Sequence, residues 1–300
     1  MKMMKTIRDA HFVPYWIDME PEVPVPRTDW IQLQYLDLAY GPGALQTLDL
    51  YLPESGTGPL PVVVLVHGGG FCACDKRDWH LYPGFYALQK GFALASVNYR
   101  LTPEVKFPTP VEDIKAAVRF LRVHAHEYGL CEKELFLYGT SAGGNLVALA
   151  GLQNAGMPEA VQGVAALCPI LDFEDQWHYL SGLPKDNPMR GMLEAAAVQY
   201  LGNTPEQIPE LAQRAGAFAS ITAQAPAFYL QHGTQDLAIP VEQTRNFARA
   251  LQQTGMKQPV VLDILEGAAH AGGGPEFLEE EHIAPIFDFF LEQCKKEKEL

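Results

Sequence analysis

Residues 135–150 read LFLYGTSAGGNLVALA, and this stretch decides the expected fold of the chain. The apolar residues before Gly139 predict a buried strand, and the run Asn145–Ala150 predicts a helix. Gly139 and Gly143 stand two residues to either side of Ser141, a spacing typical of a sharp strand-to-helix turn that presents a nucleophilic serine. Glycine is needed because the turn leaves no room for side chains and strains the serine backbone. The stretch therefore predicts acyl-transfer chemistry at Ser141.

A second glycine-rich motif, His67-Gly68-Gly69-Gly70-Phe71, directly follows the strand expected at Pro61–Val66. Attack on an ester places a negative charge on the former carbonyl oxygen, and preorganised N–H donors stabilise that charge when no side chain blocks them. We predict that the backbone N–H groups of Gly69, Gly70 and Ala142 form this oxyanion hole. The alternative is a glycine-rich turn without a catalytic role. The histidine that opens the motif is interpreted as bracing the loop.

The general base should be a histidine on a loop, and the chain has nine histidines. His270 lies in the segment EGAAHAGG (266–273), directly after the apolar run Val260–Leu265 that we expect to be the last strand. Its small neighbours leave room for the ring to reach Ser141. His232 follows another expected strand and is a weaker competitor, interpreted as structural. Two further histidines have no strand end to present them and are only candidates for lining the pocket: His80 and His178.

The acid that orients the histidine should lie between serine and histidine in the chain. Asp236 fits best, because it follows the expected strand Phe228–Leu230 within a short polar loop. It would accept the ring proton of His270 and stabilise the imidazolium. Two alternatives follow the strand that ends near Leu167: Asp172 and Asp175.

Composition limits the partners of the chain. Its 300 residues carry a net charge of −14, which repels nucleic acid and anionic membranes, so both are set aside as partners. No apolar run is long enough to span a bilayer. The expected partner is a small-molecule ester, no metal or organic cofactor is implied, and homo-oligomerisation stays open.

The cysteine pattern indicates the compartment. Five cysteines are scattered along the chain without zinc-like spacing or a disulfide framework; they are Cys72, Cys74, Cys131, Cys168 and Cys294. The charged start Met1–Lys5 is followed by no apolar segment of a signal peptide, because Arg8, Asp9 and His11 interrupt it. These observations favour a reduced, cytoplasmic protein.

The order of apolar runs predicts a single domain over residues 1–300, with an N-terminal arm at 1–30 and an α/β architecture. A hairpin is expected at Ile31–Tyr40 and Leu45–Leu52, before continuous apolar runs that alternate with helices, as in a mostly parallel sheet covered on both faces. The runs lie at Val62–Val66, Phe92–Val97, Leu135–Tyr138, Val164–Leu167, Phe228–Leu230 and Val260–Leu265. The helices are expected near 79–89, 111–125, 142–154, 242–254 and 281–294. A turn-rich interval at about 172–222, with a helix at 191–201, is interpreted as a small cap insertion.

Together these motifs resemble the α/β-hydrolase superfamily, and within it the hormone-sensitive-lipase-like carboxylesterases and the acetylxylan/feruloyl esterase group. The matching stretches are His67–Gly70, Asn98–Glu104, Phe107-Pro108, Glu112-Asp113, Gly139–Gly144, His232–Asp236 and Gly267–His270. The resemblance covers about residues 60 to 295. It implies a serine esterase that forms an acyl-enzyme, and it implies structural roles for Tyr99-Arg100 and Glu112-Asp113 behind the oxyanion loop. We further expect Arg100 to pair with a carboxylate such as Asp113.

Two departures bear on the substrate. Thr140 stands where many hormone-sensitive-lipase-like members have aspartate, and no long helical cap is apparent; both features argue against long-chain triacylglycerols and favour short-acyl or plant-wall-derived acetyl and feruloyl esters. The alternatives are an arylformamidase-type amidase and a non-catalytic binding protein of the same fold. Four aromatic residues are candidates for binding the substrate, although each is as readily explained by packing: Phe71, Trp79, Trp177 and Tyr179.

Overall fold

The computed structural model describes residues 25–54, 58–271 and 275–298. Most of the expected N-terminal arm, residues 1–24, therefore lies outside the described residues. Within them the chain forms an eight-stranded sheet in the order β1-β2-β4-β3-β5-β6-β7-β8. The strands are β1 Gln34–Ala39, β2 Thr47–Tyr51, β3 Leu60–Val66, β4 Ala93–Val97, β5 Leu130–Thr140, β6 Gly163–Leu167, β7 Ala227–Gly233 and β8 Val260–Leu265.

The sheet combines an antiparallel margin with a parallel centre. β1 pairs with β2 and β2 with β4 in antiparallel fashion, which confirms the expected hairpin. All other pairings, from β4–β3 to β7–β8, are parallel. Every residue of β4, β6 and β7 is buried. These strands are buried because helices cover both of their faces, and their polar side chains are Ser96 in β4 and Gln231 and His232 in β7.

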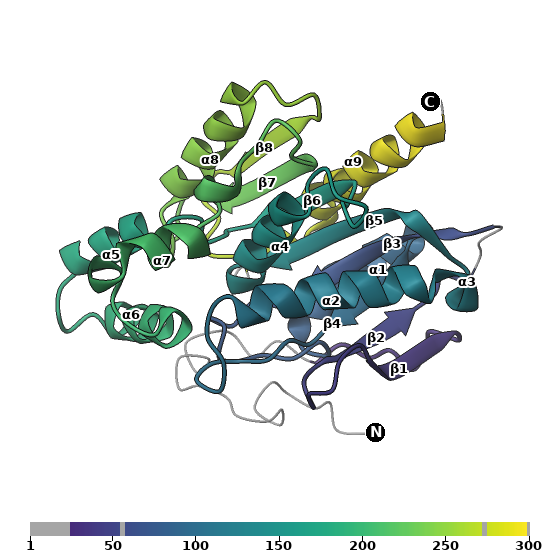
Figure 1. Cartoon of the computed structure of the whole chain (residues 1–300), viewed down its shortest axis with the longest axis horizontal. Coiled ribbons are helices and arrows are strands. Elements are labelled where there is room, and N and C mark those ends of the chain that lie inside the picture. The colour runs from purple at the N-terminus through teal and green to yellow at the C-terminus, as the bar shows by residue number, and fades with distance from the viewer. Residues whose placement is uncertain (1–24, 55–57, 272–274, 299–300) are drawn as a thin grey trace.

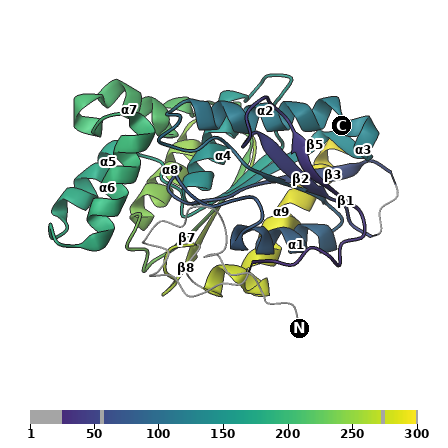
Figure 2. The same ribbon diagram turned by 90° about the horizontal axis from the view of Figure 1, so that it is seen from below.

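Helices cover the two faces of the sheet in two groups (Figures 1 and 2). Those on one face are α2 Thr109–Val123, α4 Ala142–Gln153 and α8 Val241–Gln253; those on the other are α1 Tyr82–Gln89 and α9 Glu280–Lys298. Two short elements complete these layers: the 3-10 turn η3 Trp79–Leu81 before α1, and α3 Ala125–Tyr128 after α2. The expected three-layer α/β fold is therefore confirmed.

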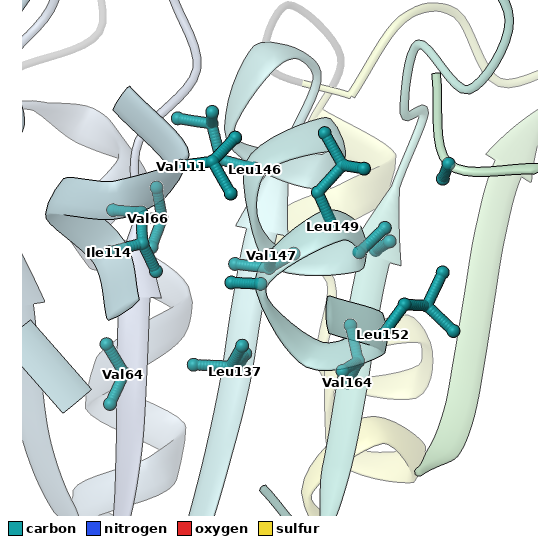
Figure 3. Packing of buried hydrophobic residues seen from close by; sticks show 14 of the residues in the cluster. Val64, Val66, Val111, Ile114, Leu137, Leu146, Val147, Leu149, Leu152 and Val164 are labelled. Atoms are coloured by element: carbon teal, nitrogen blue, oxygen red, sulfur yellow. The ribbon is translucent and has the colours of Figure 1, made fainter. Parts of the chain in front are cut away.

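The core is divided by the sheet into two apolar clusters. Figure 3 shows the larger one, in which side chains of α2 and α4 pack onto β3, β5 and β6. In this view Val111 of α2 lies beside Leu146 of α4, and Ile114 of α2 lies over Val66 of β3. α4 is buried along nearly its whole length, from Ala142 to Leu152. This helix starts at the expected nucleophile, so burial of its body fixes the position of its first turn.

In chain order, three α-helices follow β6 and precede β7, and they extend beyond one end of the sheet (Figure 1). They are α5 Phe173–Gly182, α6 Pro188–Leu201 and α7 Pro209–Ala215. Only α6 was expected. The missed helix α5 begins at Asp172, whose carboxylate accepts hydrogen bonds from the N–H groups of Glu174 and Asp175. The capping residue can be recognised in the sequence, but α5 is mostly polar and so shows no clear apolar periodicity. Its buried face consists of Phe173, Gln176 and Leu180.

Phe136 of β5 tests how much the second core cluster stabilises the fold. Its ring stacks on Phe290 with 4.7 Å between centroids and meets Phe92 edge to face at 5.8 Å. Phe136→Ala removes a fully buried ring and leaves a cavity, so we expect the free energy of unfolding to fall by about 3–5 kcal/mol in a urea titration. Val123→Ala is the control, because Val123 is 78% exposed and should change stability by less than about 0.5 kcal/mol. Equal effects of the two substitutions would contradict this account of the core.

Candidate active site

Ser141 occupies the sharp turn between β5 and α4. Its backbone has φ 56° and ψ −119°, a strained conformation for a residue with a side chain. A hydrogen bond to β6 holds the turn in place: the N–H of Ser141 donates to the carbonyl of Leu167 at 2.8 Å. A β-carbon on Gly139 would overlap the carbonyl of Gly143, and one on Gly143 would overlap the carbonyl oxygens of Val66 and His67. Both glycines are therefore required by close backbone contact.

The glycine-rich loop after β3 lies directly against this turn. A β-carbon on Gly68 would stand 3.0 Å from the carbonyl oxygen of Thr140 and 3.4 Å from Cβ of Ser141. Gly69 and Gly70 have φ of 91° and 58°, values that favour glycine. Ala142 begins α4, and a first-turn N–H has no acceptor within its own helix. Gly68 therefore lies against the serine turn and Ala142 follows Ser141 directly, while the oxyanion hole of Gly69, Gly70 and Ala142 stays a prediction.

His67 packs against the glycine-rich loop and contacts its backbone. Its ring is buried and stacks on Tyr99 with 4.5 Å between centroids, and Nδ1 lies 2.9 Å from the carbonyl oxygen of Gly68. The Tyr99 hydroxyl donates to the carbonyls of His67 at 3.2 Å and of Gly68 at 3.1 Å. Burial lowers the pKa of His67, so the ring is held neutral. This geometry supports a bracing role for His67.

Behind Tyr99, the expected pair of Arg100 with Asp113 is present. The Arg100 guanidinium contacts the buried Asp113 carboxylate with Nη2–Oδ1 at 2.6 Å, and the backbone N–H of Arg100 donates to Oδ2 at 3.0 Å. Gln46 donates to the same carboxylate at 2.8 Å. Glu112 does not share this role, because it points to the surface and pairs with Lys115.

A second set of buried polar contacts fixes the segment that follows the oxyanion loop. The backbone N–H of Lys76 donates to Oδ1 of Asn98 at 2.6 Å, and Nδ2 of Asn98 donates to Asp75 at 2.7 Å. Arg77 pairs with the fully buried carboxylate of Asp49 on β2. The segment is thus tied to the antiparallel margin, which keeps the preceding glycines in place.

His270 and Asp236 meet at the ends of β8 and β7. Nδ1 of His270 lies 2.6 Å from Oδ2 of Asp236, and the Asp236 side chain is completely buried. The loops that carry them are tied together, because the N–H of Gln235 donates to the carbonyl of Ala268 at 2.9 Å and a β-carbon on Gly233 would overlap that same oxygen. The expected histidine and acid are therefore brought together.

The Asp236 carboxylate has several donors around it. Oδ1 accepts from the N–H groups of Ala238 at 2.8 Å and Ile239 at 2.9 Å. Oδ2 lies 2.6 Å from Nδ1 of His270 and 3.0 Å from Nε2 of His232. Burial alone would raise the pKa of Asp236, but the two histidines outweigh it and hold the pKa well below its usual range. Asp236 is therefore ionised throughout the neutral range.

His232, the weaker competitor for the base, lies beneath the acid. Its ring is completely buried, with Nδ1 2.7 Å from the Thr244 hydroxyl and Nε2 also 3.1 Å from the carbonyl of Ile239. With both ring nitrogens engaged in the core, His232 supports Asp236 structurally. The alternative acid Asp172 is occupied as the cap of α5.

The electrostatics of His270 follow from this acid. Burial would lower the pKa of the imidazole, but the Asp236 carboxylate outweighs it and raises the pKa well above its ordinary value. The His270 side chain is 24% exposed, so it is open to solvent while its partner is not. The pair combines a basic imidazole with a permanently charged, immobile carboxylate.

The four candidate substrate-binding aromatics have different surroundings. Phe71 is only 3% exposed and stacks on Tyr200 of α6 with 3.7 Å between centroids. Trp79 is also buried and stacks on His80 at 3.6 Å. Tyr179 of α5 donates from its hydroxyl to the carbonyl of Leu237, next to the acid, at 2.9 Å, and Trp177 is half-buried on the same helix.

One feature of the site escaped the sequence analysis, and one histidine considered there as a pocket-lining candidate lies against the glycine-rich loop. Cys168, considered only as one of five scattered cysteines, lies beside Asp236 and His270. His80 is buried, its Nδ1 lies 2.8 Å from Asp78, and its Nε2 lies 2.9 Å from where a β-carbon on Gly68 would stand. A signal existed for Cys168: it directly follows an expected strand, and the carboxyl ends of parallel strands meet at one edge.

A strained serine between a parallel strand and a helix, a glycine loop beside it and a His–Asp pair at the same sheet edge define an α/β-hydrolase. A model of the BD-FAE family matches residues 48–251, and the chain belongs to the BD-FAE family. The expected resemblance is thus confirmed. In the described part of the chain, no helix combines the length and apolar character needed to cross a membrane.

Individual relatives agree with this family. Esterase LipC of Mycobacterium tuberculosis is 30% identical over 246 residues, which make up 77% of this chain and 58% of LipC. The chain spans between half and three fifths of the length of the first three curated relatives it matches.

Solved structures share the fold. A truncated carbohydrate esterase from gut microbiota superposes with a TM-score of 0.78 at 21% identity, covering 90% of this chain and 99% of that one. An acetyl ester-xyloside bifunctional hydrolase from Caldicellulosiruptor lactoaceticus gives a TM-score of 0.68 at 21% identity, covering 89% and 93%. At these identities they establish the fold alone.

The raised pKa of His270 has a measurable consequence for titration and stability. We expect NMR to show His270 titrating above the ordinary value of about 6.5, and Asp236→Asn to lower that pKa because the carboxylate is its cause. Because folding raises the pKa of His270, the interaction of its protonated ring with Asp236 stabilises the folded protein, and this contribution is complete below about pH 6.5. That stabilisation is lost as pH rises through the folded pKa, since the imidazolium then loses its proton. The difference in free energy of unfolding between the parent and Asp236→Asn should therefore become smaller as the pH rises through the pKa of His270.

Asp172→Asn is the matched control for this titration, because asparagine caps a helix as well as aspartate does while the same charge is removed. It should leave the His270 titration unchanged. An identical His270 pKa in the parent and in Asp236→Asn would contradict the assigned pair.

Proposed function

We propose that this protein is a serine carboxylesterase with Ser141 as nucleophile, His270 as general base and Asp236 as the orienting acid. The observation that carries the proposal is that the functional residues follow the ends of four strands, β3, β5, β7 and β8, at one edge of the sheet. Ser141 stands at the end of β5 on its strained turn, the glycine-rich loop follows β3 beside it, and His270 is held by Asp236 at 2.6 Å. Relatives such as LipC are named esterases, which supports the same activity.

The proposed reaction proceeds in two halves. His270 takes the hydroxyl proton as Ser141 attacks the ester carbonyl, and the N–H groups of Gly69, Gly70 and Ala142 stabilise the resulting oxyanion. The intermediate collapses to an acyl-enzyme as His270 gives its proton to the departing alcohol. Water then attacks the acyl-enzyme by the same route and frees Ser141. The ionised Asp236 stabilises the imidazolium in both halves.

For the substrate we propose short-acyl or plant-wall-derived esters of the acetyl or feruloyl type. A carbohydrate esterase and an acetyl ester-xyloside hydrolase among the structural neighbours support this class. We assign the cap role to α5, α6 and α7, because Tyr179 of α5 donates to Leu237 next to the acid and Tyr200 of α6 stacks on Phe71 of the oxyanion loop. The proposed cap is thus joined to the loop that carries Asp236 and to the glycine-rich loop.

Within this proposal the four aromatic residues divide into two groups. Phe71 and Trp79 are too tightly packed to stack on a substrate ring and would act as walls that limit the acyl chain. Trp177 and Tyr179, both partly exposed on α5, would contact the substrate from the cap. Short acyl groups are favoured because the stacked rings of Phe71 and Tyr200 occupy the space beside the oxyanion loop.

Ser141→Ala tests the proposed nucleophile. We expect kcat on p-nitrophenyl acetate to fall roughly 10³- to 10⁶-fold, because the covalent route is removed while binding and the oxyanion hole remain. The parent protein would also be tested on p-nitrophenyl butyrate and octanoate, methyl ferulate, acetylated xylo-oligosaccharide and N-formylkynurenine, with Ser141→Ala as the blank. Faster turnover of the formyl amide than of every ester would favour the arylformamidase-type alternative. Turnover of none of these substrates by the parent would contradict the proposed activity.

Phe71→Ala tests the proposed wall. Removing the ring opens space beside the oxyanion loop, so the ratio of kcat/KM for octanoate to that for acetate should rise by roughly 10-fold, the value of a few methylene groups gaining apolar contact. Phe218→Ala serves as control: this ring lies against Phe247 in the core, with 5.3 Å between centroids. It should affect stability but leave the ratio unchanged. An unchanged ratio in Phe71→Ala would remove Phe71 from the acyl site.

A further inference from the structure

Cys168 occupies a strained position at the end of β6. Its backbone has φ 43°, in the left-handed region that disfavours a residue with a side chain, and its side chain is completely buried. The N–H of Cys168 donates to the carbonyl of Gln231 on β7 at 2.8 Å, and the preceding carbonyl, that of Leu167, accepts from Ser141. Cys168 therefore sits in the sheet edge between the strand of the serine and the strand of the acid. A glycine would adopt this conformation without strain, so the presence of a cysteine here requires an explanation.

The thiol contacts the histidine loop at two points. Its Sγ accepts a hydrogen bond from the backbone N–H of Ala271, the residue after His270, at 3.2 Å. Sγ, a ring nitrogen of His270 and a carboxylate oxygen of Asp236 all lie within 4.8 Å of one another. Contact with the thiol also contributes to the raised pKa of His270. Cys168 thus touches both the ring and the following peptide.

Asp236 alone does not determine where the imidazole points. Its hydrogen bond to Nδ1 fixes one ring atom, and the ring could still tilt about that bond, since the loop before it contains Gly267 with φ 81°. Anchoring the N–H of Ala271 fixes the main chain on the far side of the histidine. With one anchor on the ring and one on the backbone, the second nitrogen can face only a narrow range of directions.

We propose that Cys168 is a positioning residue for His270: its thiol anchors the Ala271 peptide and the imidazole, and so aims the ring at Ser141. This inference rests on the proposed function. Cysteine suits the position because it adds no charge beside Asp236; burial raises the pKa of the thiol, which stays protonated at neutral pH. Serine would reach less far, since a carbon–oxygen bond is shorter than a carbon–sulfur bond.

Three variants test the proposal: Cys168→Ala, Cys168→Ser and, as matched control, Cys294→Ala, which removes a buried thiol from α9. For Cys168→Ala we expect kcat on p-nitrophenyl acetate to fall roughly 10- to 100-fold, the effect of a misplaced catalytic group, with KM within about 2-fold. The acid limb of kcat/KM should move to lower pH, because loss of the thiol contact lowers the pKa of His270. Cys168→Ser should recover part of kcat, and Cys294→Ala should match the parent.

A purely structural role would lower the thermal midpoint without moving the pH limb. Cys168→Ala with the parent's kcat and pH limb, or with only a lower midpoint, would overturn the proposal. Its failure is distinguishable from failure of the proposed function, which is judged by Ser141-dependent turnover of the parent. Independently of activity, the NMR signal of the His270 Nδ1 proton should exchange faster with solvent in Cys168→Ala than in Cys294→Ala. Equal exchange in the two variants would also contradict the positioning role.

Discussion

The contact of Gly143 with the carbonyl oxygens of Val66 and His67 is the constraint on which the site depends. Here the start of α4 lies against the end of β3 so closely that no side chain fits between them. The same approach brings Gly68 against Thr140 and Ser141. Burial of α4 and parallel pairing of β3 with β5 hold the two segments together, so core packing fixes the positions of Ser141, the proposed nucleophile, and of the glycine-rich loop.

Charge in the site is concentrated on one buried group. Asp236 is ionised because two backbone N–H groups and two histidines surround it, and this charge makes His270 more basic. The neighbouring Cys168 is neutral, so it can hold the histidine without competing for its proton. A second carboxylate in its place would repel Asp236 and share the imidazolium, which would weaken the orientation of the ring.

Outside the site, ion pairs with buried carboxylates bind the irregular segments to the sheet. Asp113 holds the backbone and side chain of Arg100, behind the tyrosine that supports the oxyanion loop. Asp49 on β2 holds Arg77 in the segment that follows the loop. Removing one partner of such a pair leaves a buried charge uncompensated, which costs far more than the pair contributes. The antiparallel strands thus serve as an anchor for the loop as well as an extension of the sheet.

The sequence by itself determined the succession of strands along the chain, the serine turn, the glycine loop and the candidates His270 and Asp236, because each depends on local backbone geometry or on position after an apolar run. Tertiary structure decided the rest. It showed α5 and α7, whose residues Phe173, Ala212 and Ala215 join the larger core cluster although the sequence shows no helical periodicity there. It separated Glu112, at the surface, from Asp113, in the core. It also placed Cys168 beside His270, 102 positions away in the numbering, because only the parallel sheet brings the ends of β6 and β8 to one edge.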